Sequence, residues 1–275
     1  MNAAINRVGE GSVPAAVHWP EVFMEALGLG LFMISAGLFG TLLESPASPF
    51  HRALPDPLLR RALMGIAMGL TAVGLVYSPW GRRSGAHINP AVTATFFRLG
   101  RVGSRDAIAY VVAQFVGGLL GVLAVALIFG DAFLEPPVGA VATLPGPWGL
   151  ATAFGSELAI SFLLMTVVLG LGRSTRLGPY TGLVVGGLVC LYIVVEAPLS
   201  GMSMNPARTL ASALPVRSWH GLWVYFTAPF GGMLLAAELH LRLSRGNHRA
   251  GCAKLDHRGP CIFCGTRCTQ PRRAT

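Results

Sequence analysis

Charged residues are scarce in this chain. Asp, Glu, Lys and Arg make up only 12% of its 275 residues, whereas an ordinary soluble domain carries roughly a quarter. Hydrophobic residues make up 53%, so the composition excludes an ordinary soluble domain and predicts a bundle of membrane helices. Six apolar stretches approach or exceed the roughly 20 residues that cross a bilayer: about 22–43, 62–80, 107–130, 149–171, 180–199 and 219–241.

The apolar stretches also lack the side chains that catalysis requires. They contain neither a Ser/His/Asp arrangement nor a His/Glu motif on one helix face, and a membrane enzyme would need a nucleophile or a metal cluster inside the bundle. We therefore predict that the chain is not an enzyme and that it needs no cofactor.

Lys and Arg are absent from residues 131–147, a segment between two apolar stretches. Basic residues gather instead in the segments that lie inside if the N-terminus is cytoplasmic, which is the bias typical of inner-side loops. Arg52, Arg60 and Arg61 fall on the outer side and weaken this bias. The distribution predicts an integral protein of the cell (inner) membrane with both termini in the cytoplasm, and it argues against a nucleic-acid site despite the net charge of +9.

A ten-residue sequence occurs twice. Residues 84–93 (Ser-Gly-Ala-His-Ile-Asn-Pro-Ala-Val-Thr) match residues 200–209 (Ser-Gly-Met-Ser-Met-Asn-Pro-Ala-Arg-Thr) at six of ten positions. In each copy Asn is a favoured N-cap and the following Pro a favoured first helical residue, so each copy predicts a helix that starts among apolar segments. Backbone that breaks at membrane depth is tolerated where it is buried in protein or lines a water-filled cavity. The pair therefore predicts a central polar pathway.

The repeat divides the chain into two halves. Glu25 near the start of the first half corresponds to Glu157 in the second, and each half has three apolar stretches. An odd number of crossings inverts the second half, so the two short helices enter from opposite faces and meet near the midplane. We predict an all-α membrane protein, an inverted 3+3 repeat, divided into a cytoplasmic N-terminal segment 1–21, a first repeat 22–130 with half-helix 89–98, an extracytoplasmic loop 131–147, a second repeat 148–243 with half-helix 205–214, and a Cys/Arg-rich cytoplasmic tail 244–275.

The paired Asn-Pro-Ala boxes, the Ser-Gly-Ala-His lead-in to the first, the Arg after the second and the Glu in the first helix of each half resemble the aquaporin family, also called major intrinsic proteins. The resemblance covers roughly residues 20–243. It implies six transmembrane helices plus two re-entrant half-helices, a homotetramer in the lipid bilayer with one pore per subunit, and passive conduction of water or small neutral solutes.

The repeated boxes indicate how such a pore would select its permeant. Asn89 and Asn205 would present amide donors to the lumen, while two half-helix N-termini aim positive charge at the same point and oppose cations and protons. Backbone carbonyls of the lead-ins can form a hydrogen-bonding ladder for water. The candidate pore residues are the boxes Asn89, Pro90, Ala91, Asn205, Pro206 and Ala207 and the carbonyl ladder Gly85, Ala86, His87, Ile88, Gly201, Met202 and Ser203.

The resemblance also implies a selectivity filter made of Met68, Val189, Met202 and Arg208. Arg208 should face the water path because a charge exposed to hydrocarbon is costly; the alternative is an ion pair with Glu196 or a bond to a loop carbonyl. Val189 stands where strict water channels carry His, with Cys190 an alternative in that register, and Thr209 stands where glycerol facilitators carry Asp. Water as the main permeant and a broader glycerol-type facilitator therefore both remain open.

The matched acids Glu25 and Glu157 allow two interpretations. Each carboxylate could accept bonds from backbone N–H groups of a re-entrant loop or take part in proton transport. Loop support is favoured because an unmade buried hydrogen bond is costly. An ion-coupled secondary transporter is disfavoured, because the acids recur as a matched, scaffold-like pair. His87 either lines the inner pore or holds its loop.

The tail from about residue 244 carries four cysteines, Cys252, Cys261, Cys264 and Cys268, with His248 and His257 nearby. The spacing of these cysteines is compatible with zinc or redox chemistry. The favoured interpretation is a solvated tail with reduced thiols and no metal, because a second metal-type pair at the usual long spacing is missing. Basic residues of the tail could also contact anionic lipid headgroups.

Overall fold

The chain folds as a bundle of helices. The computed structural model describes residues 16–243, 252–258 and 260–264, and these residues contain no β-strand. Six of the helices are long and apolar enough to cross a membrane, which confirms the number of spans predicted from the sequence. They are α1 (Trp19–Glu44), α3 (Pro57–Tyr77), α6 (Ser104–Phe129), α8 (Gly149–Leu171), α9 (Thr181–Val195, extended in its span by η2, Gly178–Tyr180) and α12 (Leu222–Leu243).

The second span lies closer to the N-terminus than the predicted 62–80. Helix α3 starts at Pro57 because Asp56 caps it, with Oδ1 accepting the Leu58 N–H over 2.8 Å. It ends at Tyr77 because Ser78 is extended and caps the next helix, accepting the Gly81 N–H over 2.9 Å. Local capping, which hydropathy does not register, therefore shifts this span.

Short elements connect the long helices. Two of them are the predicted half-helices, α5 (Pro90–Arg98) and α11 (Pro206–Val216). The others are α2 (Pro49–Ala53), α4 (Pro79–Ser84), α7 (Asp131–Leu134), η1 (Gly139–Val141) and α10 (Ala197–Ser200).

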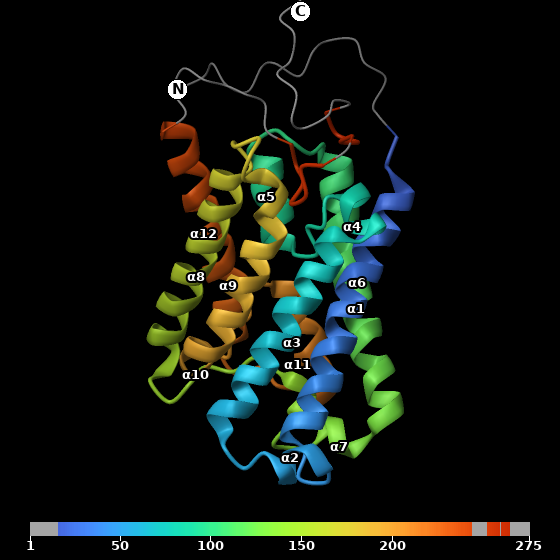
Figure 1. Cartoon of the computed structure of the whole chain (residues 1–275), viewed down its shortest axis with the longest axis vertical. Coiled ribbons are helices and arrows are strands. Elements are labelled where there is room, and N and C mark those ends of the chain that lie inside the picture. Colours follow the sequence, from blue (N-terminus) through green and yellow to red (C-terminus); the bar gives the residue numbers. More distant parts are fainter. Residues whose placement is uncertain (1–15, 244–251, 259, 265–275) are drawn as a thin grey trace, which may run out of the picture.

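The two halves have the same arrangement (Figure 1). Helix α1 packs against α6 in the first half, α8 packs against α12 in the second, and α3 packs against α9 between the halves. Each half-helix contacts the last long helix of the other half, α5 against α12 and α11 against α6. The half-helices enter from opposite ends of the bundle, and α1 begins at the same end at which α12 ends. This is the predicted inverted repeat.

Glycines bring paired helices into backbone contact. A Cβ added at Gly117 of α6 would lie 2.0 Å from the Ala26 carbonyl oxygen of α1, and one added at Gly69 of α3 would lie 2.6 Å from the Gly186 carbonyl oxygen of α9. Any side chain at these positions would push the helices apart. Close packing of this kind is typical of helices in lipid, where small residues form the contacts.

Large apolar side chains point away from the bundle. Phe23, Leu70, Ile108 and Leu127 are all exposed, Leu127 by 88% of its surface. A continuous apolar exterior of this size is unsuited to water and fits contact with lipid. With its six apolar spans, the chain is a membrane protein.

Candidate functional site

Each half-helix begins at the Asn of its box. The Asn89 side-chain oxygen accepts the Ala91 N–H over 2.9 Å, and Asn205 accepts the N–H groups of Ala207 and Arg208 over 3.1 and 3.2 Å. A Pro occupies the first helical turn in both. These are the N-caps that the box sequence predicts.

The two boxes are joined by reciprocal hydrogen bonds. Asn89 Nδ2 donates to the Met204 carbonyl over 2.7 Å, and Asn205 Nδ2 donates to the Ile88 carbonyl over 2.8 Å. The two half-helix N-termini therefore meet at one point inside the bundle. A side-chain amide has two N–H donors, so each Asn uses one to fix the opposite loop and keeps one for a ligand.

The lead-in to each box has an unusual backbone. Gly85 and Gly201 have positive φ values of 104° and 82°, which is why glycine occupies both positions. Residues 86, 88, 202 and 204, which are not glycines, also have positive φ, between 40° and 54°. Backbone held in this region carries strain and persists only where its surroundings fix it.

In the first half, the buried carboxylate of Glu25 fixes the lead-in. One carboxylate oxygen accepts the Ser84 hydroxyl and the His87 N–H over 2.7 and 3.1 Å. The other accepts the Ile88 N–H over 2.5 Å and the Gln114 amide over 2.8 Å. The loop-support interpretation therefore describes the contacts of Glu25.

Glu157 does the same in the second half. It accepts the N–H groups of Ser203 and Met204 over 2.6 and 2.7 Å and the Ser200 hydroxyl over 2.9 Å. Ser200 also contacts the buried carboxyl of Glu196. Glu196 thus belongs to the support of the second loop.

A cavity of about 460 Å³ runs past both boxes. It is lined by Asn89 and Asn205, and also by all four predicted filter residues, Met68, Val189, Met202 and Arg208. Val189 rather than Cys190 faces it, because Cys190 packs against Gly65 and Gly69 of α3. Of the two residues that the sequence offered at this position, Val189 is the one on the cavity wall.

Arg208 is held by the loop that connects the two halves. Its Nη1 donates to the hydroxyl of Thr143, and no ion pair joins it to Glu196 in the part of the chain that the structure describes. Arg61 lines the same cavity, and Glu44 lies beside it but is paired with Arg60, 3.2 Å away. The two arginines therefore border the same cavity as the two half-helix N-termini, which carry partial positive charge.

The tail corrects an expectation from the sequence. A solvated tail was favoured, but the described residues 252–257 are buried against the end of the bundle where α4 lies. The Leu255 N–H donates to the Gly85 carbonyl over 3.0 Å, and His87 Nε2 donates to the Ala253 carbonyl over 3.0 Å. Ala253 and Leu255 pack into the apolar core, and Leu255 also lines the cavity, which explains why this segment is not solvated. Residues His248 and Cys268 lie outside the described part of the chain.

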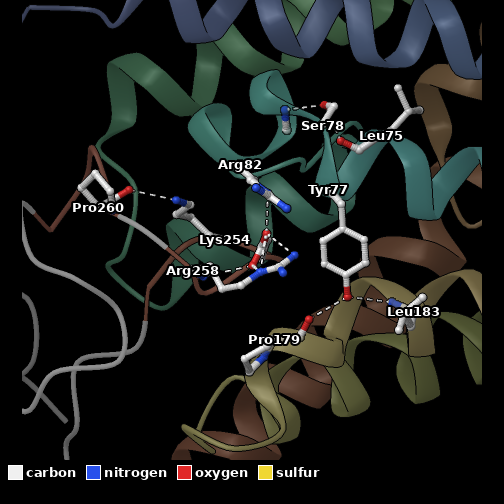
Figure 2. A network of polar contacts seen from close by, with 11 residues as sticks. Leu75, Tyr77, Ser78, Arg82, Pro179, Leu183, Lys254, Arg258 and Pro260 are labelled. Atoms are coloured by element: carbon white, nitrogen blue, oxygen red, sulfur yellow. Dashed lines mark hydrogen bonds and ion pairs between the residues drawn. The ribbon is translucent and has the colours of Figure 1, made fainter.

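Polar contacts hold the tail in this position. Figure 2 shows Arg82 and Arg258 converging on one carboxylate, which belongs to the fully buried Asp256 at 3.0 Å from each guanidinium. The Arg258 guanidinium also lies 4.8 Å from the centre of the Tyr77 ring. Burial, with Arg101 as a second cause, lowers the pKa of the His257 imidazole to about 4, so that ring is neutral in the docked tail at neutral pH.

His87 combines the two roles that the sequence left open. It lines the cavity, and it also holds its loop, because Nδ1 lies 3.1 Å from the Thr93 hydroxyl. Sequence reasoning missed Gln114, Thr143 and Leu255 as parts of the site. Gln114 lies in the stretch Ala113-Gln114-Phe115, which has a counterpart, Ala228-Pro229-Phe230, in the second half, and this was a usable signal. Thr143 and Leu255 had none.

Comparisons with known proteins agree with this geometry. The family model of the major intrinsic proteins matches residues 14–240. Aquaporin NIP1-2 of Arabidopsis thaliana is 40% identical over 184 residues, and Aquaporin NIP1-1 of the same plant is 37% identical over 192 residues; each alignment covers 65% of this chain and 62% of the relative. The chain thus spans about 62% of the length of these curated relatives.

A solved structure shares the fold. The X-ray structure of the aquaglyceroporin from Plasmodium falciparum superposes with a TM-score of 0.68 at 22% identity, and the match covers 81% of this chain and 95% of that one. Two facing Asn-Pro-Ala half-helices, braced by matched acids and matched by the family model over most of the length, establish that the chain belongs to the major intrinsic protein family.

Proposed function

We propose that the chain is a passive channel that conducts water through the cavity between α5 and α11 and excludes protons and ions. One observation carries the proposal: the reciprocal bonds of Asn89 and Asn205 bring two half-helix N-termini together on the wall of one cavity. The remaining amide donors and the lead-in carbonyls can exchange hydrogen bonds with water nearly evenly. They cannot replace the hydration shell of a cation, which two converging helix dipoles also repel.

The filter supports a small neutral solute as a second permeant. Met68, Val189 and Met202 bring no charged or strongly hydrogen-bonding group to the constriction, and Met adapts its shape to its neighbours. We propose water as the main permeant and a solute of the size of glycerol as a minor one. The relatives named above are described as aquaporins, which supports water.

The finer assignments are proposals of the same kind. Arg82 and Arg83 lie in α4, at the end of the bundle where α1 begins and α12 ends, and the positive-inside bias places this end in the cytoplasm. We propose the cell membrane as the location. The homotetramer is proposed from family membership, and the mass of the purified assembly measured in detergent would test it.

The test is an osmotic step applied to vesicles containing the purified protein. We expect these vesicles to shrink faster than bare lipid, with a weaker temperature dependence, since water would no longer have to dissolve in hydrocarbon. No acceleration by folded protein would contradict the proposal, and flux driven by a pH gradient would favour a coupled transporter instead.

A matched pair of variants on α9 locates the pathway. Val189 lines the cavity, whereas Leu191 is 52% exposed on the outer surface of the same helix. We expect Val189→Trp to abolish water flux by filling the constriction and Leu191→Trp to leave flux unchanged. Equal loss in both variants would mean that water does not pass Val189.

A further inference from the structure

The docked tail and a conducting pore compete for the same groups. Gly85 supplies the first carbonyl of the proposed water ladder, and that carbonyl accepts the N–H of Leu255. The Leu255 side chain lines the cavity, and Nε2 of the cavity-lining His87 donates to Ala253. The tail thus makes the bonds that water would make at this mouth of the pore.

A cluster of cysteines lies directly beside this blocking segment. The sulfur atoms of Cys252, Cys261 and Cys264 all lie within 4.8 Å of one another, and those of Cys252 and Cys264 are 3.4 Å apart. Cys252 and Cys261 flank the segment in sequence and are both buried. Cys252 is disulfide-bonded in the structure, while Cys261 carries a thiol.

The spacing of these sulfur atoms matches a metal site. Thiolates bound to tetrahedral zinc at about 2.3 Å lie about 3.8 Å from one another, which is within the range found here. Thiolate ligands select zinc among the common divalent ions of the cell. Structural zinc sites have four ligands, and Cys268, four positions after Cys264, lies outside the described residues.

We propose that the reduced chain binds one Zn²⁺ through Cys252, Cys261 and Cys264, and that the bound metal holds residues 253–258 as a plug in the pore mouth. Two cellular thiols such as glutathione first reduce the Cys252 disulfide and form their own disulfide, as they do on the cytoplasmic side, where the tail is placed. Metal binding then releases the thiol protons and transfers no electrons. The plug rests on the proposed channel function, whereas the metal site does not.

The cysteine cluster can control residues 253–258 because binding one metal to Cys252, Cys261 and Cys264 closes the chain segment between them into a loop. Fixing Cys252 to Cys261 and Cys264 removes most of the freedom that the segment gains when it leaves the mouth. The C-terminal part of the cysteine cluster is also packed against the bundle, since the Phe263 ring lies 6.4 Å from that of His87 and 6.0 Å from that of Tyr110. Metal binding therefore favours the closed mouth by mass action.

The metal site is tested first, without reference to transport. The full chain, purified with a phosphine reductant, is mixed with Co²⁺ as a spectroscopic probe and with Zn²⁺ for stoichiometry. We expect one metal per chain and a thiolate-to-cobalt charge-transfer band. Both should disappear in Cys261→Ser/Cys264→Ser and persist in Cys190→Ser, whose cysteine lies in α9 away from the cluster. Folded, reduced protein that binds no metal would overturn the site.

The plug is tested by water flux in vesicles prepared from zinc-loaded and metal-free protein. We expect several-fold slower flux with zinc in the parent and no difference in the double cysteine variant. Leu255→Gly should keep the metal but lose the block, because it removes the side chain that lines the cavity. Zinc that binds without slowing flux in the parent would overturn the plug. Parent protein that conducts no water in either form, yet binds the metal, would instead count against the channel.

Discussion

The two re-entrant loops start from the same design and end with different neighbours. In both, a buried Glu accepts two lead-in N–H groups and a Ser hydroxyl, and the Asn of each box reaches the other loop. Tyr110 and Tyr225 donate to corresponding carbonyls, those of Ser84 and Ser200, over 2.9 and 2.5 Å. Contacts that occur twice hold the strained backbone and serve the scaffold.

Two sets of contacts that occur once lie toward the two ends of the cavity. The first loop offers His87 and Gly85 to the tail. The second loop carries Arg208 where the first has Val92, and ties it to Thr143. The difference teaches that the repeat builds the shared scaffold of the two loops, while the departures from symmetry give each end of the cavity its own chemistry.

The acids provide the largest expected effect. The Glu25 carboxylate accepts four hydrogen bonds, two on each oxygen. In Glu25→Gln an NH₂ group replaces one of these oxygens and cannot accept, so two of the four donors are left unpaired. Each buried unpaired donor costs about 1–3 kcal/mol, giving about 2–6 kcal/mol in total. We expect a large fall in the unfolding temperature in detergent, with the exposed Glu135→Gln as control. Unchanged stability of Glu25→Gln would mean that the acid does not brace the loop.

What the sequence predicts well in these loops is local or repeated. The N-caps at Asn89 and Asn205 follow from residue type, and the braces Glu25 and Glu157 from their recurrence. Thr143 and Ala253 could not be foreseen, because each meets its partner across more than 60 residues of chain and belongs to no repeat or periodic pattern. Their contacts depend on tertiary packing alone.

Replacing Arg208 with Val makes the second box resemble the first. We expect Arg208→Val to raise the flux of urea and small monovalent cations, because it removes both the charge and the bulk of the guanidinium. If the substitution lowers the barrier to permeation by about 1.4 kcal/mol, the flux of these solutes rises about tenfold. Vesicle flux assays measure it, and Arg98→Val, which removes a half-exposed Arg at the end of α5, is the control. Identical selectivity in a folded Arg208→Val protein would place the filter elsewhere.

A smaller effect on selectivity is expected at Val189, the residue that α9 of the second repeat contributes to the proposed filter. Val189→His adds a donor and bulk to an apolar wall, so it should suppress glycerol flux more than water flux. Ile193→His, one helical turn away on the same lining face, should have less effect on that ratio. If the parent shows no glycerol flux above bare lipid, the Met side chains already close the aperture to a water's width.

The smallest effect is expected at Glu196, which has no counterpart in the first loop. The Ser200 hydroxyl has one hydrogen but contacts the carboxyls of both Glu157 and Glu196, and a proton on one of the two carboxyls supplies the second donor. Glu157 accepts two backbone N–H groups, which favours its ionised form. Glu196 is thus the protonated partner, and its second oxygen is buried without a hydrogen bond among the described residues.

Glutamine discriminates between the two acids. The amide of Glu196→Gln can donate to Ser200 as a protonated acid does, so we expect its unfolding temperature and water flux to match the parent. Glu157→Gln sets an amide donor against the N–H of Ser203 or Met204 and should lower the unfolding temperature, though less than Glu25→Gln, because fewer donors lose their acceptor. Equal destabilisation by Glu196→Gln and Glu157→Gln would mean that Glu196 is ionised and that the second loop is braced by two charged acids.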